Sequence, residues 1–154
     1  MKMSLSSDAD VPDLIDQLYQ ARRSGRVELA PALIPLLRHT DALVREEAVS
    51  LLLTKWRLVS LHSDAQHFLE ADDDEGVRSR AALGFAATST AQTRVQDAQT
   101  LAEAFNAEET TSTVRAACVE ALHLLLGRAI ITEEGEASAQ HVRALLHELG
   151  ASTE

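Results

Sequence analysis

The chain has 154 residues, of which 45% are hydrophobic and only 3% are aromatic. This is about one domain's worth of chain and is long enough to bury a sizeable core, which must be built mostly from small aliphatic side chains. Six glycines and three prolines are too few for a turn-rich β-sandwich or a disordered chain. Acidic residues outnumber basic ones by 24 to 14, so the net charge is −10. That charge excludes most nucleic-acid binders and argues against anionic membrane surfaces, because both kinds of partner need a cationic footprint.

A single cysteine, Cys118, leaves no possibility of an internal disulfide or a thiolate zinc cluster, and one free thiol suits a reducing compartment. The first eleven residues lack the basic segment and apolar run of a signal peptide. No apolar stretch approaches the roughly 20 residues that span a bilayer. We therefore expect a cytoplasmic protein without membrane contact. Its predicted organisation is a disordered terminus over 1–10, one domain over 11–150 and a tail over 151–154.

The residue pattern predicts eight helices. The first spans 12–24, because Pro12 suits a first helical position and Gly25 suits a stop. The last spans 136–149, where apolar residues recur at helical spacing before Gly150. Residues 127–135 carry no clear pattern. Between the end helices we predict three helix pairs, each made of an A-helix, a short turn and a B-helix: 28–38 with 42–56, 60–71 with 75–88, and 92–106 with 112–126.

The three predicted B-helices share one pattern, built around the dipeptide Val-Arg at 44–45, 77–78 and 114–115. Four positions after each valine stands a small residue, and eight positions after it a large apolar one: Ala48, Ala81 and Cys118, then Leu52, Phe85 and Leu122. Three positions before each valine stands a residue that caps helices: Asp41, Asp74 and Thr111. The pattern predicts a buried stripe that begins at each valine, with small residues where neighbouring helices approach closely.

These segments, LIPLL and TDALVREEAVSLL within 33–52, DDDEGVRSRAALGF at 72–85 and STVRAACVEAL at 112–122, resemble the HEAT repeat family, including its short bacterial lyase-type variant. The resemblance covers roughly two-thirds of the chain. It implies an all-α fold, a right-handed α-solenoid of about three helix pairs with B-helices on the concave side. It also implies a bend at Pro35 in the first A-helix, a proline that the second and third pairs lack. The helices at 12–24 and 136–149 are predicted to cap the stack.

Two charged features have structural and functional interpretations. Arg45, Arg78 and Arg115 are predicted to reach the acidic turns of neighbouring repeats and form a ladder, with ligand contact as the alternative. Residues 70–75 hold five acids in six positions. We expect a solvated turn in which Asp74 caps the next helix. A docking site for a basic partner and a cation site are the alternatives, although the ligand pattern of an EF-hand is absent.

No motif indicates catalysis. The six histidines include no pair at the i, i+4 spacing of a helical metal site, and the His147-Glu148 dipeptide stands alone. Cys118 occupies a small-residue position of the buried stripe, where a thiol is inert. Motifs for a serine nucleophile, a phosphate loop or a dinucleotide are missing. We therefore predict no catalytic residue, no metal and no cofactor. Trp56 is interpreted as a packing residue, with an exposed aromatic anchor as the alternative.

The outward positions of the B-helices are the predicted partner-contact residues. Three of them are leucines that would be exposed and rimmed by charge, as at a protein interface, a dimer contact or the margin of a wider core. The set consists of Glu46, Glu47, Ser50, Leu53, Arg57, Arg80, Leu83, Glu120 and Leu124.

The predicted function is a non-catalytic protein–protein binding module, an adaptor, scaffold or inhibitor that uses the concave B-helix face. The net charge of −10 favours a partner with a basic surface. The chain itself is expected to be a monomer or weak homodimer. One alternative is an immunity-type inhibitor of a basic bacterial toxin. A repeat-based enzyme of the lyase or hydroxylase type is less favoured, because it would need a metal or chromophore site that the sequence does not mark.

Overall fold

A computed structural model describes residues 10–128 and 138–151 and is helical throughout these ranges, without a strand. Outside them lie residues 1–9 and 152–154, which belong to the predicted terminal segments 1–10 and 151–154. Residues 129–137, from the unassigned stretch and the start of the predicted last helix, also lie outside them. None of the helices in the described ranges is long and apolar enough to cross a membrane. In chain order the elements are α1 (Val11–Ser24), η1 (Val27–Leu29), α2 (Ala30–Leu33), η2 (Ile34–Arg38), α3 (Ala42–Val49), η3 (Ser50–Lys55), η4 (Val59–Leu61), α4 (His62–Ala71), α5 (Glu75–Ala87), α6 (Arg94–Asn106), α7 (Ser112–Leu125) and α8 (Ala139–Glu148).

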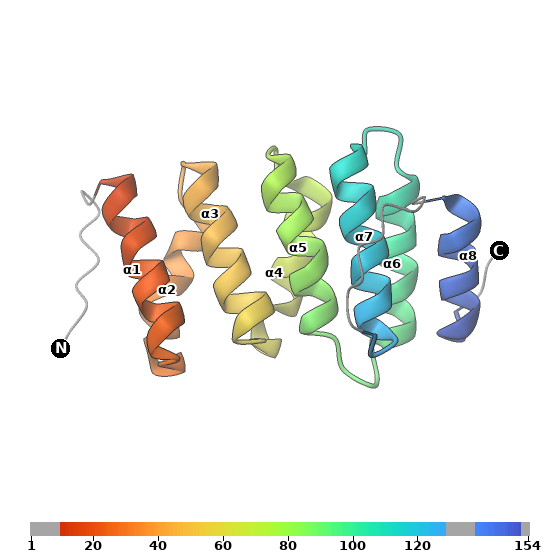
Figure 1. Ribbon diagram of the computed structural model, residues 1–154, viewed down its shortest axis with the longest axis horizontal. Helices are drawn as coiled ribbons and strands as arrows, with labels where there is room; N and C mark the ends of the chain where they lie inside the picture. Colours follow the sequence, from red (N-terminus) through yellow and green to blue (C-terminus); the bar gives the residue numbers. More distant parts are fainter. Residues whose placement is uncertain (1–9, 129–137, 152–154) are drawn as a thin grey trace.

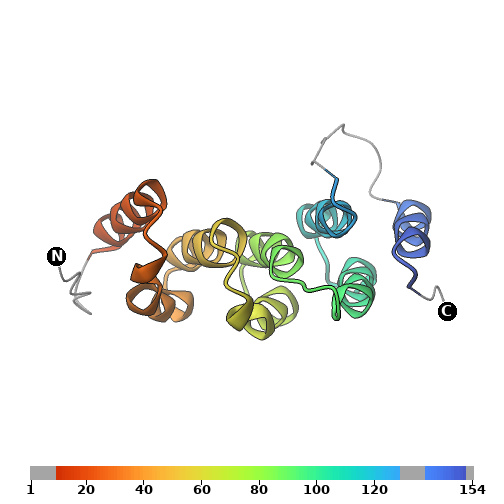
Figure 2. The same ribbon diagram turned by 90° about the horizontal axis from the view of Figure 1, so that it is seen from below.

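The helices form two layers (Figures 1 and 2). α1, α3, α5 and α7 stand side by side in one layer, while α2, α4 and α6 lie behind them, and α8 closes the end of the array. The contacts between elements agree with the predicted pairs, since η2 packs on α3, α4 on α5 and α6 on α7. α5 is the central element, because it also packs on α3, η3 and α7.

The A-helix predicted at 28–38, with a bend at Pro35, is broken more often than expected. The structure divides it into the 3-10 turn η1, a single α-turn in α2 and the 3-10 segment η2. Pro31 and Pro35 lie near the starts of the last two pieces. Each proline lacks an N–H donor, and its ring clashes with the carbonyl four residues earlier, so a regular α-helix cannot continue through this segment.

The predicted caps of the B-helices are confirmed. A side-chain oxygen of Asp41, Asp74 and Thr111 accepts a hydrogen bond from the backbone N–H three residues later. Gly25 ends α1 in the left-handed conformation at φ 63°, as the stop signal predicted. α8 begins at Ala139, later than the predicted Glu136, and the Ser138 hydroxyl accepts from the N–H of His141 at its start.

The core runs along the seam between the layers and uses the predicted stripe. The valines, small residues and large apolar residues of the repeat pattern are all buried, most of them completely: Val44, Ala48, Leu52, Val77, Ala81, Phe85, Val114, Cys118 and Leu122. Ala151, in the predicted tail, is buried as well. Small side chains at the repeat positions allow the helix axes to come close, which explains why a chain with few aromatic residues still fills its interior.

The end of the first B-helix departs from α-helical geometry. From Ser50 the segment continues as the π-helix η3, and Arg57 then ends it at φ 52°, a left-handed conformation that is unfavourable for a residue with a side chain. Trp56 is partly buried against the core, and its indole Nε1 is buried with no acceptor in the described part of the chain. The packing interpretation of Trp56 is therefore confirmed over the exposed anchor.

Candidate functional site

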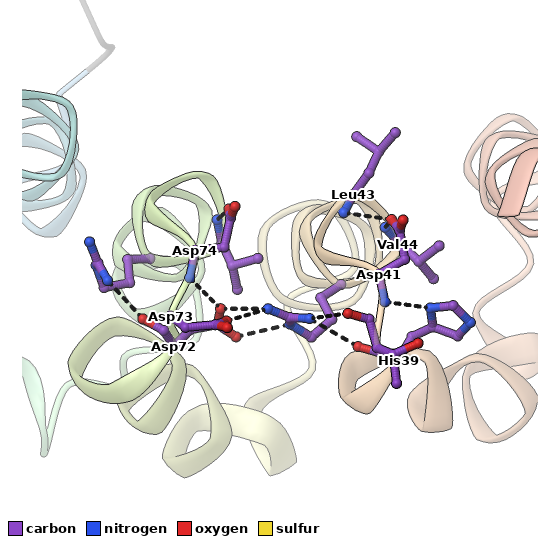
Figure 3. A network of polar contacts seen from close by, with 11 residues as sticks. His39, Asp41, Leu43, Val44, Asp72, Asp73 and Asp74 are labelled. Atoms are coloured by element: carbon purple, nitrogen blue, oxygen red, sulfur yellow. Dashed lines mark hydrogen bonds and ion pairs between the residues drawn. The ribbon is translucent and has the colours of Figure 1, made fainter.

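The acidic turn between α4 and α5 is bound by an arginine of the preceding helix pair, so it links that pair to the pair formed by α4 and α5 (Figure 3). The Arg45 guanidinium, on α3, donates to both carboxylate oxygens of Asp72 at 3.1 and 2.8 Å and to Asp73 at 2.8 Å. The Arg45 and Asp72 side chains are only 12% and 6% exposed, whereas Asp73 is 92% exposed. Burial acts to raise the pKa of Asp72, but the hydrogen bonds from Arg45 and from the backbone N–H of Asp74 hold that pKa below its ordinary value.

The recurrent arginines share a role that differs in part from the predicted ladder. Arg45 donates to the carbonyls of His39 and Thr40, Arg78 to that of Asp72, and Arg115 to that of Phe105. Each guanidinium thus satisfies backbone oxygens where the preceding A-helix ends, which would otherwise lack partners. Among the residues that the structure describes, only Arg45 also reaches an acidic side chain of the next repeat. The ladder is therefore confirmed at its first step and wrong for Arg78, whereas the acidic residues that follow α7, the expected partners of Arg115, lie outside the described ranges.

On the outward surface of the B-helices, the predicted contact residues Glu46 and Glu47 already face arginines of neighbouring helices. Arg22 on α1 donates to the Ser50 hydroxyl at 2.9 Å and lies 3.7 Å from the Glu47 carboxylate. Arg80 on α5 donates to the Glu46 carboxylate at 3.1 Å. The structure thus brings four of the predicted contact residues into two interhelical polar clusters. Charges that are paired in this way are less available to a partner.

Leu53 does not belong to that surface. Its side chain is 0% exposed and faces Gly84 on α5, where a Cβ added to the glycine would lie 2.6 Å from the Leu53 Cβ. The prediction of an exposed leucine is wrong, because the π-helical winding of η3 and the close approach of α5 turn this position inward. Leu83 and Leu124 are half-buried and pack against the core, in line with the wider-core alternative. Glu120 is also half-buried, and Arg57 is exposed.

The carboxylates of the turns are concentrated at one of the two long edges of the array. The turns that lead into α3, α5 and α7, and the start of α1, lie at one edge (Figure 1). We call its carboxylates the acidic edge: Asp10, Asp13, Asp41, Glu70, Asp72, Asp73, Asp74, Glu75, Glu108 and Glu109. At the opposite edge the exposed side chains are mostly basic: Arg23, Arg26, Lys55, Arg57, Arg94 and Arg128. Two of them, Arg26 and Arg128, form ion pairs with the exposed Glu28 and Glu148 at the same edge.

Helix dipoles do not offset the charge of the acidic edge. Each B-helix begins where its A-helix ends, so the partial charges of the two termini largely cancel. The nearby cations are Arg38, Arg45, Arg78 and Arg115, fewer than the carboxylates. Glu108 and Glu109 are exposed in the turn before α7. The edge therefore carries an excess of negative charge toward solvent.

A polar cluster without any signal in the local sequence joins α4, α5 and α6. The ring of His62 stacks on Phe85, with its Nδ1 2.8 Å from the Thr88 hydroxyl and its Nε2 3.1 Å from the Asp97 carboxylate. Asp97 also accepts from the hydroxyls of Ser89 and Thr93 at 2.6 and 2.7 Å. The order Asp97–His62–Thr88 resembles a nucleophile with its base, but Thr88 is 0% exposed and no substrate can reach its hydroxyl. No local spacing relates His62 to Asp97, so only the tertiary contact identifies this cluster.

The Cys118 thiol should not react with thiol reagents in the native protein. Its side chain is fully buried, and burial raises its pKa to about 12, so almost no thiolate exists at pH 8. We expect Ellman's reagent to label Cys118 promptly in guanidinium chloride but only at the rate of unfolding without it. Prompt labelling of the native chain would contradict the burial of the Cys118 thiol.

No set of three or more histidine, cysteine, aspartate or glutamate side chains with the geometry of a metal site is present in residues 10–128 and 138–151. Comparison of the chain with models of protein families, with curated proteins and with solved structures gives no match.

Proposed function

We propose that this protein is a HEAT-like α-solenoid that binds a basic surface of a protein partner and does not catalyse a reaction. The recurrence of capped helix pairs in two layers supports the solenoid. The acidic edge supports the choice of partner, because complementary potentials accelerate association and suppress wrong partners. The module would act as an adaptor, a scaffold or an inhibitor. An inhibitor of a basic toxin needs to bind only that one partner, so a single acidic surface would be sufficient for this function.

The acidic edge replaces the B-helix face as the proposed contact surface. On the face, Glu46 and Glu47 are compensated by Arg80 and Arg22, and Leu53 is inaccessible. On the edge, Glu70, Glu108 and Glu109 are exposed, and neither glutamate in the turn before α7 is needed as a cap. The excess charge of the edge is the observation that carries the proposal.

The proposal is tested by charge reversal at matched positions. One variant carries Glu70→Lys, Glu108→Lys and Glu109→Lys at the edge. The control carries Asp16→Lys, Glu28→Lys and Glu103→Lys, which are also exposed and change the net charge equally. Proteins captured from extracts of the source cells by the immobilised wild type are identified, purified and titrated calorimetrically against all three chains.

We expect the edge variant to bind its partner at least about tenfold more weakly, with a reduced dependence on salt, and the control to bind nearly as the wild type does. Equal loss in both variants would mean that only the net charge matters. A wild type that captures no partner better than the edge variant does would contradict the proposed function.

A further inference from the structure

Two histidines from different helices meet at the end of the array. His123 lies on α7 and His141 on α8, 18 residues apart in the chain, with their Nε2 atoms 3.2 Å apart. The ring centroids are 5.3 Å apart and the rings are inclined by 37°. Both residues are only partly buried.

This separation fits two ligands of one metal ion. Zinc binds imidazole nitrogen at about 2.0–2.1 Å, and at a tetrahedral angle two such nitrogens lie about 3.3 Å apart. Without a metal, only one of the facing Nε2 atoms can carry the proton between them. We propose that His123 and His141 bind a divalent transition-metal ion between α7 and α8, with water in the remaining coordination positions.

Charges of both signs lie beside the His123 ring. Burial lowers the pKa of His123, and the neighbouring His141 and Arg128 lower it further, while Glu148 acts in the opposite direction. Arg128 forms an ion pair with Glu148 and donates its backbone N–H to the carbonyl of His123 at 3.0 Å. A histidine ligand must offer a lone pair on its ring nitrogen, and the two facing Nε2 atoms are placed to offer theirs to one ion.

A metal at this place would fasten the last helix. α8 contacts α6 and α7 through its buried face, made by Val142, Leu145 and Leu146. The metal would add a link between α7 and α8 outside that apolar contact. The expectation that the chain holds no metal depends on histidine spacing within single helices, a criterion that cannot detect ligands from two helices.

Two imidazole ligands favour the binding of transition-metal ions such as copper, nickel and zinc. The affinity for copper should exceed that for nickel or zinc, and magnesium and calcium, which prefer oxygen ligands, should not bind. The test is calorimetric titration of the full chain at pH 7.5 with zinc chloride, and with magnesium chloride as the negative control. The variants are His123→Gln and His141→Gln, and His147→Gln is the matched control, because His147 is exposed on the same helix α8.

We expect one zinc ion per chain, an affinity lower by at least about tenfold in each of the first two variants, and no change in His147→Gln. Imidazole nitrogen resonances in the wild type give a second readout that needs no variant, and those of His123 and His141 alone should shift with zinc. Absence of zinc binding, binding that survives both substitutions, or shifts at other histidines would overturn the proposal.

Discussion

Replacing Arg45 by alanine is expected to lower the free energy of unfolding by about 3–5 kcal/mol, because it leaves the buried Asp72 carboxylate without its cation. The substitution also removes the donor to the carbonyls of His39 and Thr40. Urea-induced unfolding followed by circular dichroism measures the loss. Asp73→Ala is the matched control: Asp73 contacts the same guanidinium but is 92% exposed, so its removal should change the free energy of unfolding by less than about 1 kcal/mol.

The effect of Arg45→Ala should depend on pH with a definite sign. In the wild type the folded state holds the pKa of Asp72 below its ordinary value, so this pair stabilises the fold above about pH 4, the ordinary aspartate value, and the contribution is lost as the pH falls through the folded-state pKa. In the variant, protonation of Asp72 relieves the uncompensated buried charge. The difference between the two proteins should therefore narrow in acid. A difference that stays constant from pH 7 to pH 3, or an equal loss in Asp73→Ala, would refute the role assigned to this ion pair.

Replacing Gly84 by valine is expected to destabilise the fold by about 3 kcal/mol, at the upper end of the usual range for overpacking. A Cβ at this position would lie 2.6 Å from the Leu53 Cβ, which cannot move without its backbone, so α5 must separate from η3. Gly84→Ala should cost less, since alanine regains about 1 kcal/mol of helix propensity.

Gly76→Ala is the control for this contact. The atoms nearest to a Cβ at Gly76 are the Glu46 Oε2 at 2.8 Å and the capping Asp74 Oδ1 at 3.0 Å, both at the ends of side chains. The Glu46 carboxylate can move at the cost of its exposed ion pair with Arg80. We expect Gly76→Ala to destabilise the fold less than Gly84→Val does, because only side-chain ends must shift and the helix propensity of alanine offsets up to about 1 kcal/mol. Thermal unfolding of the three variants measures the order. A Gly84→Val chain as stable as the wild type would show that α5 and η3 do not pack as closely as the structure has them.

Most of the helix boundaries are predictable because the signals that set them are local. Asp41, Asp74 and Thr111 cap the B-helices by reaching a backbone N–H three residues away, and Gly25 ends α1 by its own backbone freedom. The first A-helix is the exception, since the apolar spacing around its two prolines predicts one helix, for which a bend at Pro35 alone was expected. The missing N–H groups and the ring clashes of the prolines outweigh that spacing.

Surface chemistry is less predictable, because it depends on which neighbour faces each position. Regular α-helical periodicity, counted from Val44, places Leu53 on the outward face. The π-helix that begins at Ser50 has more residues per turn and rotates Leu53 away from that face. Arg45 and Arg78 each follow a valine and stand four residues after a capping aspartate. Arg45 binds acidic side chains of the next helix pair, whereas the Arg78 guanidinium donates to the carbonyl of Asp72. The His62–Asp97 and His123–His141 contacts join residues on different helices.

The sequence by itself determined an all-helical chain of repeated, capped pairs with a core of small aliphatic side chains, since composition, capping and apolar periodicity act within a few residues. Its excess of acids also set the net charge of −10, which is the same however the chain folds. Only the tertiary structure decided where that charge lies, by placing the turns into the B-helices at one edge. It also decided which polar groups meet, because a contact between two helices depends on their separation and rotation, and neither quantity is encoded at a fixed spacing along the chain.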